Sequence, residues 1–473
     1  MTKLLLVLIA LSAYASANAA ELPRYQALDL GTLGGRNSFG MAINEAGQVT
    51  GHSDTSNGQI HAFLYSGGRM IDLGTFGGPH SVGWDINEAG QVTGSATTAN
   101  TLGHVFLYAN GNMANLGEVP GGCCSTGIAI NESGQIAGDA SGSFDNHAFL
   151  YKNGVMSDLG TFGGSSSQAF AINDAGEVVG QAYAANDASR RAFVYRDGAL
   201  MDLGTLGGNT SGASDINESG QIAGISQTGD SSSFHAFLHT GATMLDLGTL
   251  GGNFSGAGAL NNAGEVVGSS NTTDGATHAF LFSQGLMVDL GAMLDENFSI
   301  ATDINNVGQV TGYVCCSDAF LSSDAFVYSD GEVLNVNDHI AGLFPPPARP
   351  NVRIEGTGST KINDRGQILA LANFYNVQRT VIKRNHAVVL TPISLLYELL
   401  IDKVAGADLN ESLLNKVSES FSHYSADRKP GTCSKLRTFI QQVELLQVTS
   451  LPAALKRELL ASARAIRQAV GCS

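Results

Sequence analysis

The stretch Asp29-Leu30-Gly31-Thr32-Leu33-Gly34-Gly35 decides the fold, because the chain returns to it at regular intervals. Copies of this phrase span residues 72–78, 158–164, 202–208 and 246–252. A second phrase is an Ile-Asn pair, Ile43-Asn44 in its first copy, followed by a glycine and then Gln or Glu. Its later copies begin at Ile86, Ile130, Ile172, Ile216, Leu260, Ile304 and Ile362, spaced 42 to 44 residues apart except for a last gap of 58. The chain up to about residue 390 is therefore a series of eight repeats.

Each repeat holds four short runs of strand-forming residues separated by turn residues. In the first repeat these runs lie around Met41-Ala42-Ile43, at Gln48-Val49-Thr50, from His61 to Tyr65 and from Arg69 to Leu73. Four strands in about 44 residues are typical of a β-propeller blade, whereas a β-helix, the alternative, normally has shorter coils. The sequence therefore predicts an all-β fold, a single β-propeller of about eight four-stranded blades.

The first strand of each repeat carries a small residue three positions before its Ile or Leu. These residues are Gly40, Gly83, Gly127, Ala169, Ala213, Ala257, Ala301 and Ser359. Inner strands of a propeller crowd together, which explains a small residue at one fixed depth. The stretch from Tyr25 to Leu30 is an extra fourth strand, and we predict that it completes the last blade, since an open ring would leave two strand edges unpaired. His386 to Leu390 is a second candidate for that place, and the sequence leaves the choice open.

These repeated phrases resemble the HAF-repeat family of probable extracellular proteins, named after a His-Ala-Phe tripeptide. The tripeptide stands at His61-Ala62-Phe63, His147-Ala148-Phe149 and His278-Ala279-Phe280, and the resemblance covers residues 25–383. Some repeats depart from the pattern, as at Asn115-Leu116-Gly117-Glu118, Arg191-Ala192-Phe193 and Arg379-Thr380-Val381. The resemblance implies secretion and a repeat architecture, and it implies no activity.

The C-terminal part differs in kind, with helical periodicity over 395–404, 412–424, 435–448 and 453–470. The run from Cys433 to Val443 resembles the signature of the small helical FIMAH-type domain, over residues 394–472. That resemblance implies an accessory role beside secreted proteins. We therefore predict three parts: a signal peptide over 1–20, the propeller over 21–391, and a small all-α domain over 392–473.

The N-terminus predicts the compartment. Lys3 precedes an apolar run from Leu4 to Leu11, and Ala17-Asn18-Ala19 provides a cleavage site. No other stretch is apolar enough to predict a membrane span. Residues 20–391 carry 14 Lys and Arg against 34 Asp and Glu, a balance that repels nucleic acid. We predict a secreted, extracellular protein, with the periplasm as an alternative.

The six cysteines are expected to form disulfides in that compartment. Cys433 and Cys472 meet if the third and fourth helices pair antiparallel. The other four form two adjacent pairs, Cys123-Cys124 and Cys315-Cys316, predicted to lie in loops and to close two vicinal disulfides. No zinc-type spacing is present, and no metal site is predicted; calcium is a weak possibility with no EF-hand spacing to support it.

Candidate ligand-binding residues are those that break the repeat, because residues present in every blade, such as His61 or Ser38, are expected to serve the scaffold. We name the side with the fourth-to-first and second-to-third connections the loop face, and the side with the first-to-second and third-to-fourth connections the turn face. The loop face varies in length and carries the insertion 337–356, and long loops often bind ligands. The candidates assigned to it are His52, His80, Trp84, Tyr183, Arg190, Arg191, Tyr313 and Arg349.

Two functions fit this pattern. The first is a non-catalytic secreted protein that binds a carbohydrate or a protein ligand on the loop face. The alternative is an extracellular polysaccharide-degrading enzyme, a lyase or glycoside hydrolase, in which His and Tyr move a proton while Arg neutralises a uronate carboxylate. No catalytic residue is assigned, and no cofactor is expected.

Overall fold

The computed structural model describes residues 25–142, 145–230, 232–315, 323–344, 351–358, 360–375, 381–406, 411–425, 429–445, 453–470 and 472. The chain divides into two compact units. We name residues 29–337 with 348–389 the β-repeat unit, and residues 1–28, 338–347 and 390–473 the helical unit. The predicted signal peptide, 1–20, lies outside the described residues.

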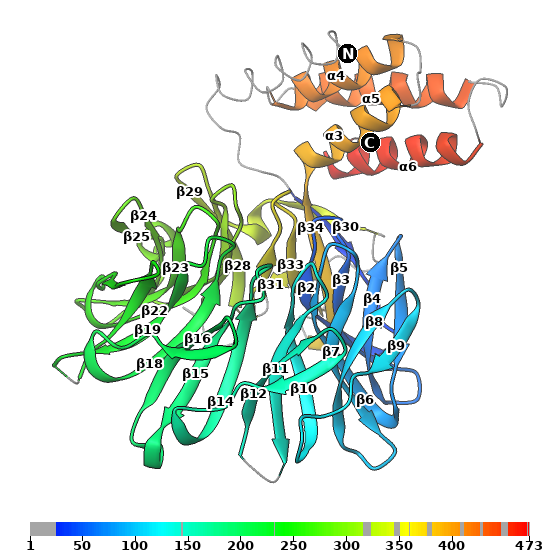
Figure 1. Cartoon of the computed structure of the whole chain (residues 1–473). Helices are drawn as coiled ribbons and strands as arrows, with labels where there is room; N and C mark the ends of the chain where they lie inside the picture. The colour runs from blue at the N-terminus through cyan, green and yellow to red at the C-terminus, as the bar shows by residue number, and fades with distance from the viewer. Residues whose placement is uncertain are drawn as a thin grey trace. The chain divides into compact units, whose positions relative to one another are not determined.

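The β-repeat unit is a propeller-like series of four-stranded antiparallel sheets (Figure 1). The first strands are β2 (Gly34–Ile43), β6 (Gly77–Ile86), β10 (Gly122–Ile130), β14 (Gly163–Ile172), β18 (Gly207–Ile216), β22 (Gly251–Leu260), β26 (Ser299–Ile304) and β32 (Lys361–Ile362). The second strands are β3 (Val49–Thr55), β7 (Val92–Thr98), β11 (Ile136–Gly142), β15 (Val178–Ala184), β19 (Ile222–Thr228), β23 (Val266–Thr272), β27 (Val310–Cys315) and β33 (Ile368–Tyr375).

The outer strands complete these sheets. The third strands are β4 (Ile60–Ser66), β8 (Gly103–Ala109), β12 (His147–Lys152), β16 (Arg190–Arg196), β20 (Phe234–His239), β24 (Thr277–Ser283), β28 (Ser323–Ser329) and β34 (Val381–Pro392). The fourth strands are β5 (Arg69–Gly74), β9 (Asn112–Asn115), β13 (Val155–Asp158), β17 (Ala199–Asp202), β21 (Met244–Asp246), β25 (Leu286–Asp289), β29 (Glu332–Asn335) and, from the start of the chain, β1 (Tyr25–Asp29). Short elements between them are η1 (Ala185–Asp187), α2 (Gly291–Leu294) and η2 (Val336–Asp338).

The middle strands are buried on both faces, since consecutive residues such as Ala62 and Phe63 are both fully buried, and each sheet therefore packs against neighbours on either side. Seven of the eight third strands carry a fully buried phenylalanine, as at Phe63, Phe106 and Phe149, and buried Val388 takes its place in β34. The predicted small residues of the first strands also serve this packing. A Cβ on Gly83 would overlap Thr50 Oγ1 of the preceding repeat, and a Cβ on Gly127 would overlap Thr93 Oγ1. The small residue is therefore required by contact with the preceding sheet.

The last repeat corrects one interpretation of the sequence. His386 in β34 places its Nδ1 2.9 Å from Asp29 Oδ1, just as His61 Nδ1 lies 2.9 Å from Asp72 Oδ1. The N–H of Leu30 donates to the carbonyl of Ala387 at 3.1 Å. His386-Ala387 is therefore the third-strand phrase of the last repeat, and Asp29 belongs to its fourth strand. The assignment of Arg379-Thr380-Val381 as that phrase was wrong, because the repeat is longer there; 376–380 lie outside the described residues.

The insertion predicted over 337–356 contributes β30 (Ile340–Phe344) and β31 (Asn351–Glu355). β30 pairs with β1 in parallel, and β31 pairs with β33 in antiparallel register. Arg353 in β31 ion-pairs with Asp324, which stands where other repeats have histidine. Residues 345–350, including the predicted site residue Arg349, lie outside the described residues.

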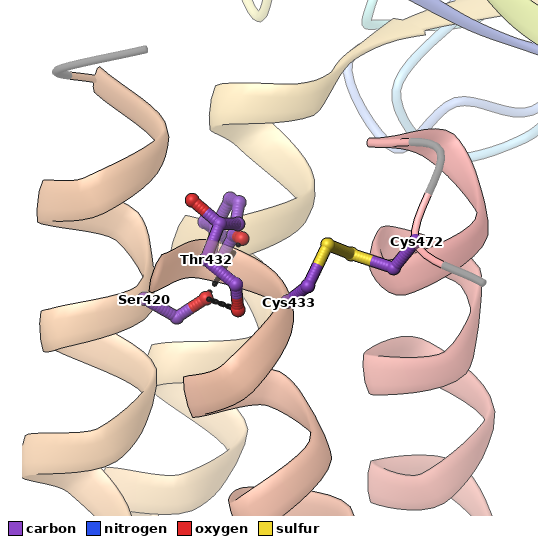
Figure 2. The surroundings of a disulfide bond; sticks show 5 residues. Ser420, Thr432, Cys433 and Cys472 are labelled. Atoms are coloured by element: carbon purple, nitrogen blue, oxygen red, sulfur yellow. Dashed lines mark hydrogen bonds between the residues drawn. A yellow bond between two sulfur atoms is a disulfide. The ribbon is translucent and has the colours of Figure 1, made fainter. Parts of the chain in front are cut away.

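The helical unit confirms the four predicted helices, as α3 (Ile393–Gly406), α4 (Glu411–Ser425), α5 (Lys429–Leu445) and α6 (Ala453–Ala469). Their apolar faces share one core that includes Tyr397, Leu436 and Phe439. Figure 2 shows the Cys433–Cys472 disulfide, which joins α5 to the end of α6 and confirms the predicted pairing. No helix among the described residues is long and apolar enough to span a membrane.

Candidate functional site

The first strands have a β-bulge at an equivalent position, and two side chains per repeat lie at this bulge. In β6, Gly83 opposes Gly94 of β7 and Asp85 opposes Thr93, so Trp84 is an extra residue without an opposite partner. The same shift occurs at the equivalent position of β2, β10, β14, β18, β22 and β26. A bulge re-aims the side chains beside it. We name the residues at these two positions the inner ring.

The inner ring has sixteen members, defined as the two residues before the Ile or Leu that recurs in each repeat. The first positions hold Met41, Trp84, Ile128, Phe170, Ser214, Gly258, Thr302 and Thr360. The second positions hold Ala42, Asp85, Ala129, Ala171, Asp215, Ala259, Asp303 and Lys361. The first strands that carry them contact one another in order, and β32 in turn contacts β2. Thr302 Oγ1 donates to the carbonyl of Thr360 at 2.8 Å, so a first-position side chain runs along this ring to the next strand.

The first positions divide into two arcs of different chemistry. Repeats 1 to 4 contribute four large apolar residues, and repeats 5 to 8 contribute only small or hydroxyl-bearing ones. Trp84 is 37% exposed and Phe170 is 38% exposed, although both lie on the first strand of a packed sheet. A Cβ on Gly83 would meet Thr50 of repeat 1, and Asp85 bonds to repeat 3, so the residues on either side of Trp84 contact the two neighbouring repeats. Exposed large apolar side chains in such a place indicate a binding surface.

The second positions add three carboxylates that are held by the backbone. Asp85 accepts the N–H of Ile86 and, from the next repeat, the N–H of Ile130, both at 2.9 Å. Asp215 likewise accepts the N–H groups of Ile216 at 2.8 Å and Leu260 at 3.0 Å. Each carboxylate therefore links two neighbouring first strands and is fixed in orientation.

One ammonium group shares the inside of the ring with these carboxylates. Lys361 Nζ lies 3.9 Å from Asp303 Oδ1, and the charge of Asp303, followed by those of Asp215 and Asp85, raises the pKa of Lys361. Burial raises the pKa of Asp215 to about 6, and burial also raises the pKa of Asp85 and of Asp303. The inner ring therefore brings together three carboxyl groups, whose pKa values burial raises, and one cation, whose side chain is 39% exposed.

A second circle of acidic side chains follows at the turn face, and we name it the acidic rim. It consists of the residue that follows the repeated Asn in each repeat: Glu45, Glu88, Glu132, Asp174, Glu218, Asn262, Asn306 and Asp364. The backbone N–H of each member donates to the side chain of the next, and Asp364 donates to Glu45 at 2.7 Å. Glu132 adds to the raised pKa of Asp85, and Asp364 adds to that of Asp303, so the rim and the inner ring act on each other electrostatically.

Among the predicted site residues, Trp84 requires a correction. It was assigned to the loop face, but it is the eighth residue of the ten-residue β6 and lies beside the turn-face end of that strand. The bulge makes it a member of the inner ring. The sequence carried a signal for this ring, because the two positions before each Ile change character from repeat to repeat while the Ile-Asn phrase does not.

The remaining predicted residues are spread over several repeats. His52 stacks on Phe39 with ring centroids 5.1 Å apart, its Nδ1 is buried without a hydrogen-bond partner, and burial lowers its pKa. His80 is exposed on β6, and its backbone N–H donates to Thr97 Oγ1 at 2.9 Å. Tyr313 lies 6.4 Å from Phe298 between ring centroids, and burial raises its pKa.

The structure brings one predicted pair together. Tyr183 of β15 opposes Arg190 at the loop-face end of β16, with Arg191 next to it. These three residues belong to repeat 4, whereas His52, His80 and Tyr313 belong to repeats 1, 2 and 7. The described residues thus form one local Tyr–Arg group on the loop face.

The cysteines differ from their prediction. Cys123 and Cys124 are free thiols in β10, with their Sγ atoms 3.1 Å apart, so the predicted vicinal disulfide is not formed and the predicted loop is a strand. The cause of their proximity is a bulge at Cys123, because consecutive side chains of a regular strand point to opposite faces. Cys315 ends β27 and is disulfide-bonded, and Cys316, the predicted partner, lies outside the described residues.

The repeated residues make the same contacts from repeat to repeat. His61, His147, His235 and His278 each pair through Nδ1 with an Asp of the adjoining fourth strand. The repeated serines link repeats: Ser81 Oγ accepts the N–H of Ala62 at 2.8 Å and donates to the carbonyl of Gly74. Such contacts explain why these residues recur.

A cavity of about 470 Å³ lies on the turn face between repeats 3 and 4. Its lining includes Lys152, Ser157, Glu177, Tyr195, Arg196 and Asp197. Arg196 and Glu177 form an ion pair, so much of the charge in this cavity is internally balanced. Within the described part of the chain, no group of three or more His, Cys, Asp or Glu is arranged to hold a metal ion.

Comparisons with known proteins give similarity to solved structures only. No protein-family model and no curated protein matches the sequence. The chain is similar to a Mycobacterium tuberculosis puromycin-hydrolyzing peptidase, with 12% identity and a TM-score of 0.44 over 76% of this chain. It spans 61% of the length of that peptidase. It is also similar to the β-propeller domain of the Trilobed protease from Pyrococcus furiosus, with 10% identity and a TM-score of 0.42, over 64% of this chain and 99% of that one.

Proposed function

We propose that this chain is a secreted, non-catalytic β-propeller, a closed ring of eight blades, that binds an extracellular carbohydrate in its inner ring. The observation that carries the proposal is the pair of aromatic side chains, Trp84 and Phe170, each more than a third exposed at the bulge of a first strand. Sugar rings present apolar C–H faces that stack on aromatic side chains, and their hydroxyl groups hydrogen-bond to fixed polar groups beside them. Asp85 supplies such a group directly after Trp84.

Closure of the ring is supported by hydrogen bonds that return to their starting point. The side-chain amide of the repeated Asn in each repeat donates to the backbone carbonyl of the equivalent Asn in the next repeat, at 2.9 to 3.2 Å. Asn363 donates to Asn44, which joins the last repeat to the first. The acidic rim and the pair Asp29–His386 make further links between the two ends of the repeat series.

Binding is favoured over catalysis by the way in which the carboxyl groups are held. Both oxygens of Asp85 accept backbone N–H groups, and so do both oxygens of Asp215. An acid or base catalyst needs an oxygen that is available to exchange its proton with the substrate. These carboxyl groups are instead fixed as hydrogen-bond acceptors, which suits recognition of hydroxyl or ammonium groups.

The experiment is calorimetric titration of the purified chain with a panel of oligosaccharides. We expect Trp84→Ala and Phe170→Ala each to weaken binding by about tenfold or more, which corresponds to about 1.4 kcal/mol. Phe298→Ala is the matched control, because this aromatic residue is equally exposed, at 36%, but immediately precedes β26 on the loop face.

The outcomes distinguish the two ends of the repeats. Loss of binding in Phe298→Ala or in Arg190→Ala, with Trp84→Ala unaffected, would move the site to the loop face that the sequence pattern predicted. Release of a reducing end or of an unsaturated sugar during the titration would establish the alternative, a polysaccharide hydrolase or lyase. Absence of binding across the whole panel would contradict the carbohydrate proposal.

A further inference from the structure

The acidic rim surrounds the approach to the inner ring from the turn face. Six of its eight members are carboxylates: Glu45, Glu88, Glu132, Asp174, Glu218 and Asp364. Burial, together with the neighbouring carboxylates, raises the pKa of Glu45 and of Glu218, so repulsion between the charges is already present in the empty rim. Walls of low dielectric constant concentrate such a field and attract oppositely charged ligands.

The interior has the same sign of charge. Asp85, Asp215 and Asp303 face the single cation of the inner ring, Lys361. The side chain of Lys361 is 39% exposed. Its ammonium lies 3.9 Å from Asp303, which is beyond hydrogen-bond distance. One positive charge therefore faces three acidic side chains, which leaves the inner ring with an excess of carboxyl groups.

The aromatic residue and the carboxylate at the centre of the apolar arc are neighbours in sequence. Trp84 is the extra residue of the bulge in β6, and Asp85 is the next residue of that strand. An aromatic face with an adjacent carboxylate is the combination that binds an ammonium group, by cation–π attraction and by a charge-assisted hydrogen bond. A neutral sugar needs only the aromatic face, and a sulfated or uronic sugar would be repelled by the rim.

From these features we propose that the ligand is an amine-bearing, cationic saccharide, whose ammonium groups enter through the acidic rim and bind to the inner-ring carboxyl groups while its sugar rings stack on Trp84. The proposal rests on the proposed function and specifies the class of sugar. A bare metal ion is a poorer occupant, since no metal-holding group of three such side chains exists among the described residues. The large apolar residues of repeats 1 to 4, together with the small residues of repeats 5 to 8, likewise fit a ring-shaped organic ligand better than an ion.

The test compares two glucosamine oligomers of equal length by calorimetry, one fully deacetylated and one fully N-acetylated, with the full chain at pH 6. We expect the deacetylated oligomer to bind at least tenfold more tightly, and we expect this preference to shrink in 0.5 M salt because counterions screen the rim. Asp85→Asn should reduce the preference several-fold. The melting temperature of this variant is measured alongside, because Asp85 also links two strands.

Lys361→Met separates recognition from folding. Removal of the only inner-ring cation should tighten binding of the deacetylated oligomer several-fold, a gain that a merely damaged protein would not show. Equal or tighter binding of the acetylated oligomer would overturn the amine proposal and leave carbohydrate binding intact. Equally tight binding of an oligolysine of the same charge would overturn the saccharide class. If no oligosaccharide binds at all, the proposed function fails with it.

Discussion

Asp139 occupies a second-strand position at which the residue type differs from repeat to repeat. It occupies the same place in its second strand as His52, Gln181 and Tyr313 do in theirs. Its Oδ1 accepts the N–H of Ala169 from the next repeat at 2.9 Å, so its side chain lies between two sheets. Burial raises the pKa of Asp139 to about 6, because desolvation outweighs the hydrogen bonds from Ala169 and Asn146. The position after the repeated second-strand glycine thus holds a titrating carboxyl group in one repeat and an aromatic ring in another.

This environment predicts a pH-dependent stability. The folded protein holds the Asp139 proton more tightly than the unfolded chain does, so its contribution to stability is fully present below about pH 4 and is lost as the pH rises through about 6. The shift corresponds to about 3 kcal/mol. Asp139→Asn mimics the protonated form and should therefore be more stable than the wild type at pH 7.5 but not at pH 4, as measured by urea unfolding. A variant that is less stable at both values would contradict this account.

The β-bulge is the element that defines the site, and it depends on glycines in the second strands. Because the first strand bulges, its carbonyl oxygen approaches the partner strand closely. A Cβ on Gly94 would overlap the carbonyl oxygen of Val82 and would lie 2.9 Å from the ring of Phe106. Gly138 and Gly180 meet the carbonyl oxygens of Thr126 and Gln168 in the same way. The glycine therefore permits the bulge, and the bulge places two side chains on the inner ring.

Gly94→Ala should accordingly destabilise the protein by about 3 kcal/mol, the upper range for overpacking. Gly103→Ala is the matched control in the same sheet, because nothing lies within 4 Å of its Cβ and its backbone is unstrained. That control should stay within about 0.5 kcal/mol of the wild type. Equal urea midpoints for the two variants would show that the bulge adjusts to a side chain.

The helices provide a second prediction at this scale. The Cys433–Cys472 disulfide joins residues 39 apart in sequence, with Cα atoms at 5.5 Å, and should stabilise the helical unit by about 3–4 kcal/mol. Replacing both cysteines by serine should lower the urea midpoint of the helical signal at 222 nm. Replacing Cys123 and Cys124 by serine is the control, since these thiols are free, and should leave that midpoint unchanged. A shift in the control alone would reverse the assignment of the bonded pair.

The whole molecule depends on how the two ends of the repeat series meet. Asp29 and Leu30, from the start of the chain, bond to His386 and Ala387 of the last repeat. Deleting residues 20–30 should lower the melting temperature by roughly 10 °C or more, because an unpaired strand edge replaces a complete sheet. Asp29→Asn is the control: it removes only a partly exposed ion pair, which contributes less than about 1 kcal/mol. An unchanged melting temperature in the deletion would show that this strand does not hold the ring.

The sequence alone determined the repeat, the four strands of each unit and the four C-terminal helices, because periodic patterns report local structure. It also predicted the Cys433–Cys472 bond and Asp29 in the last sheet. It did not reveal that Trp84 is the extra residue of a bulge in β6, because a bulge breaks the alternation on which strand reasoning depends. The grouping of Asp85, Asp215, Asp303 and Lys361 could not be predicted either, since successive members are 58 to 130 positions apart in sequence and meet only where the first strands of different repeats come together. Tertiary structure alone decides such proximity, because it follows from the arrangement of whole sheets and not from any local pattern.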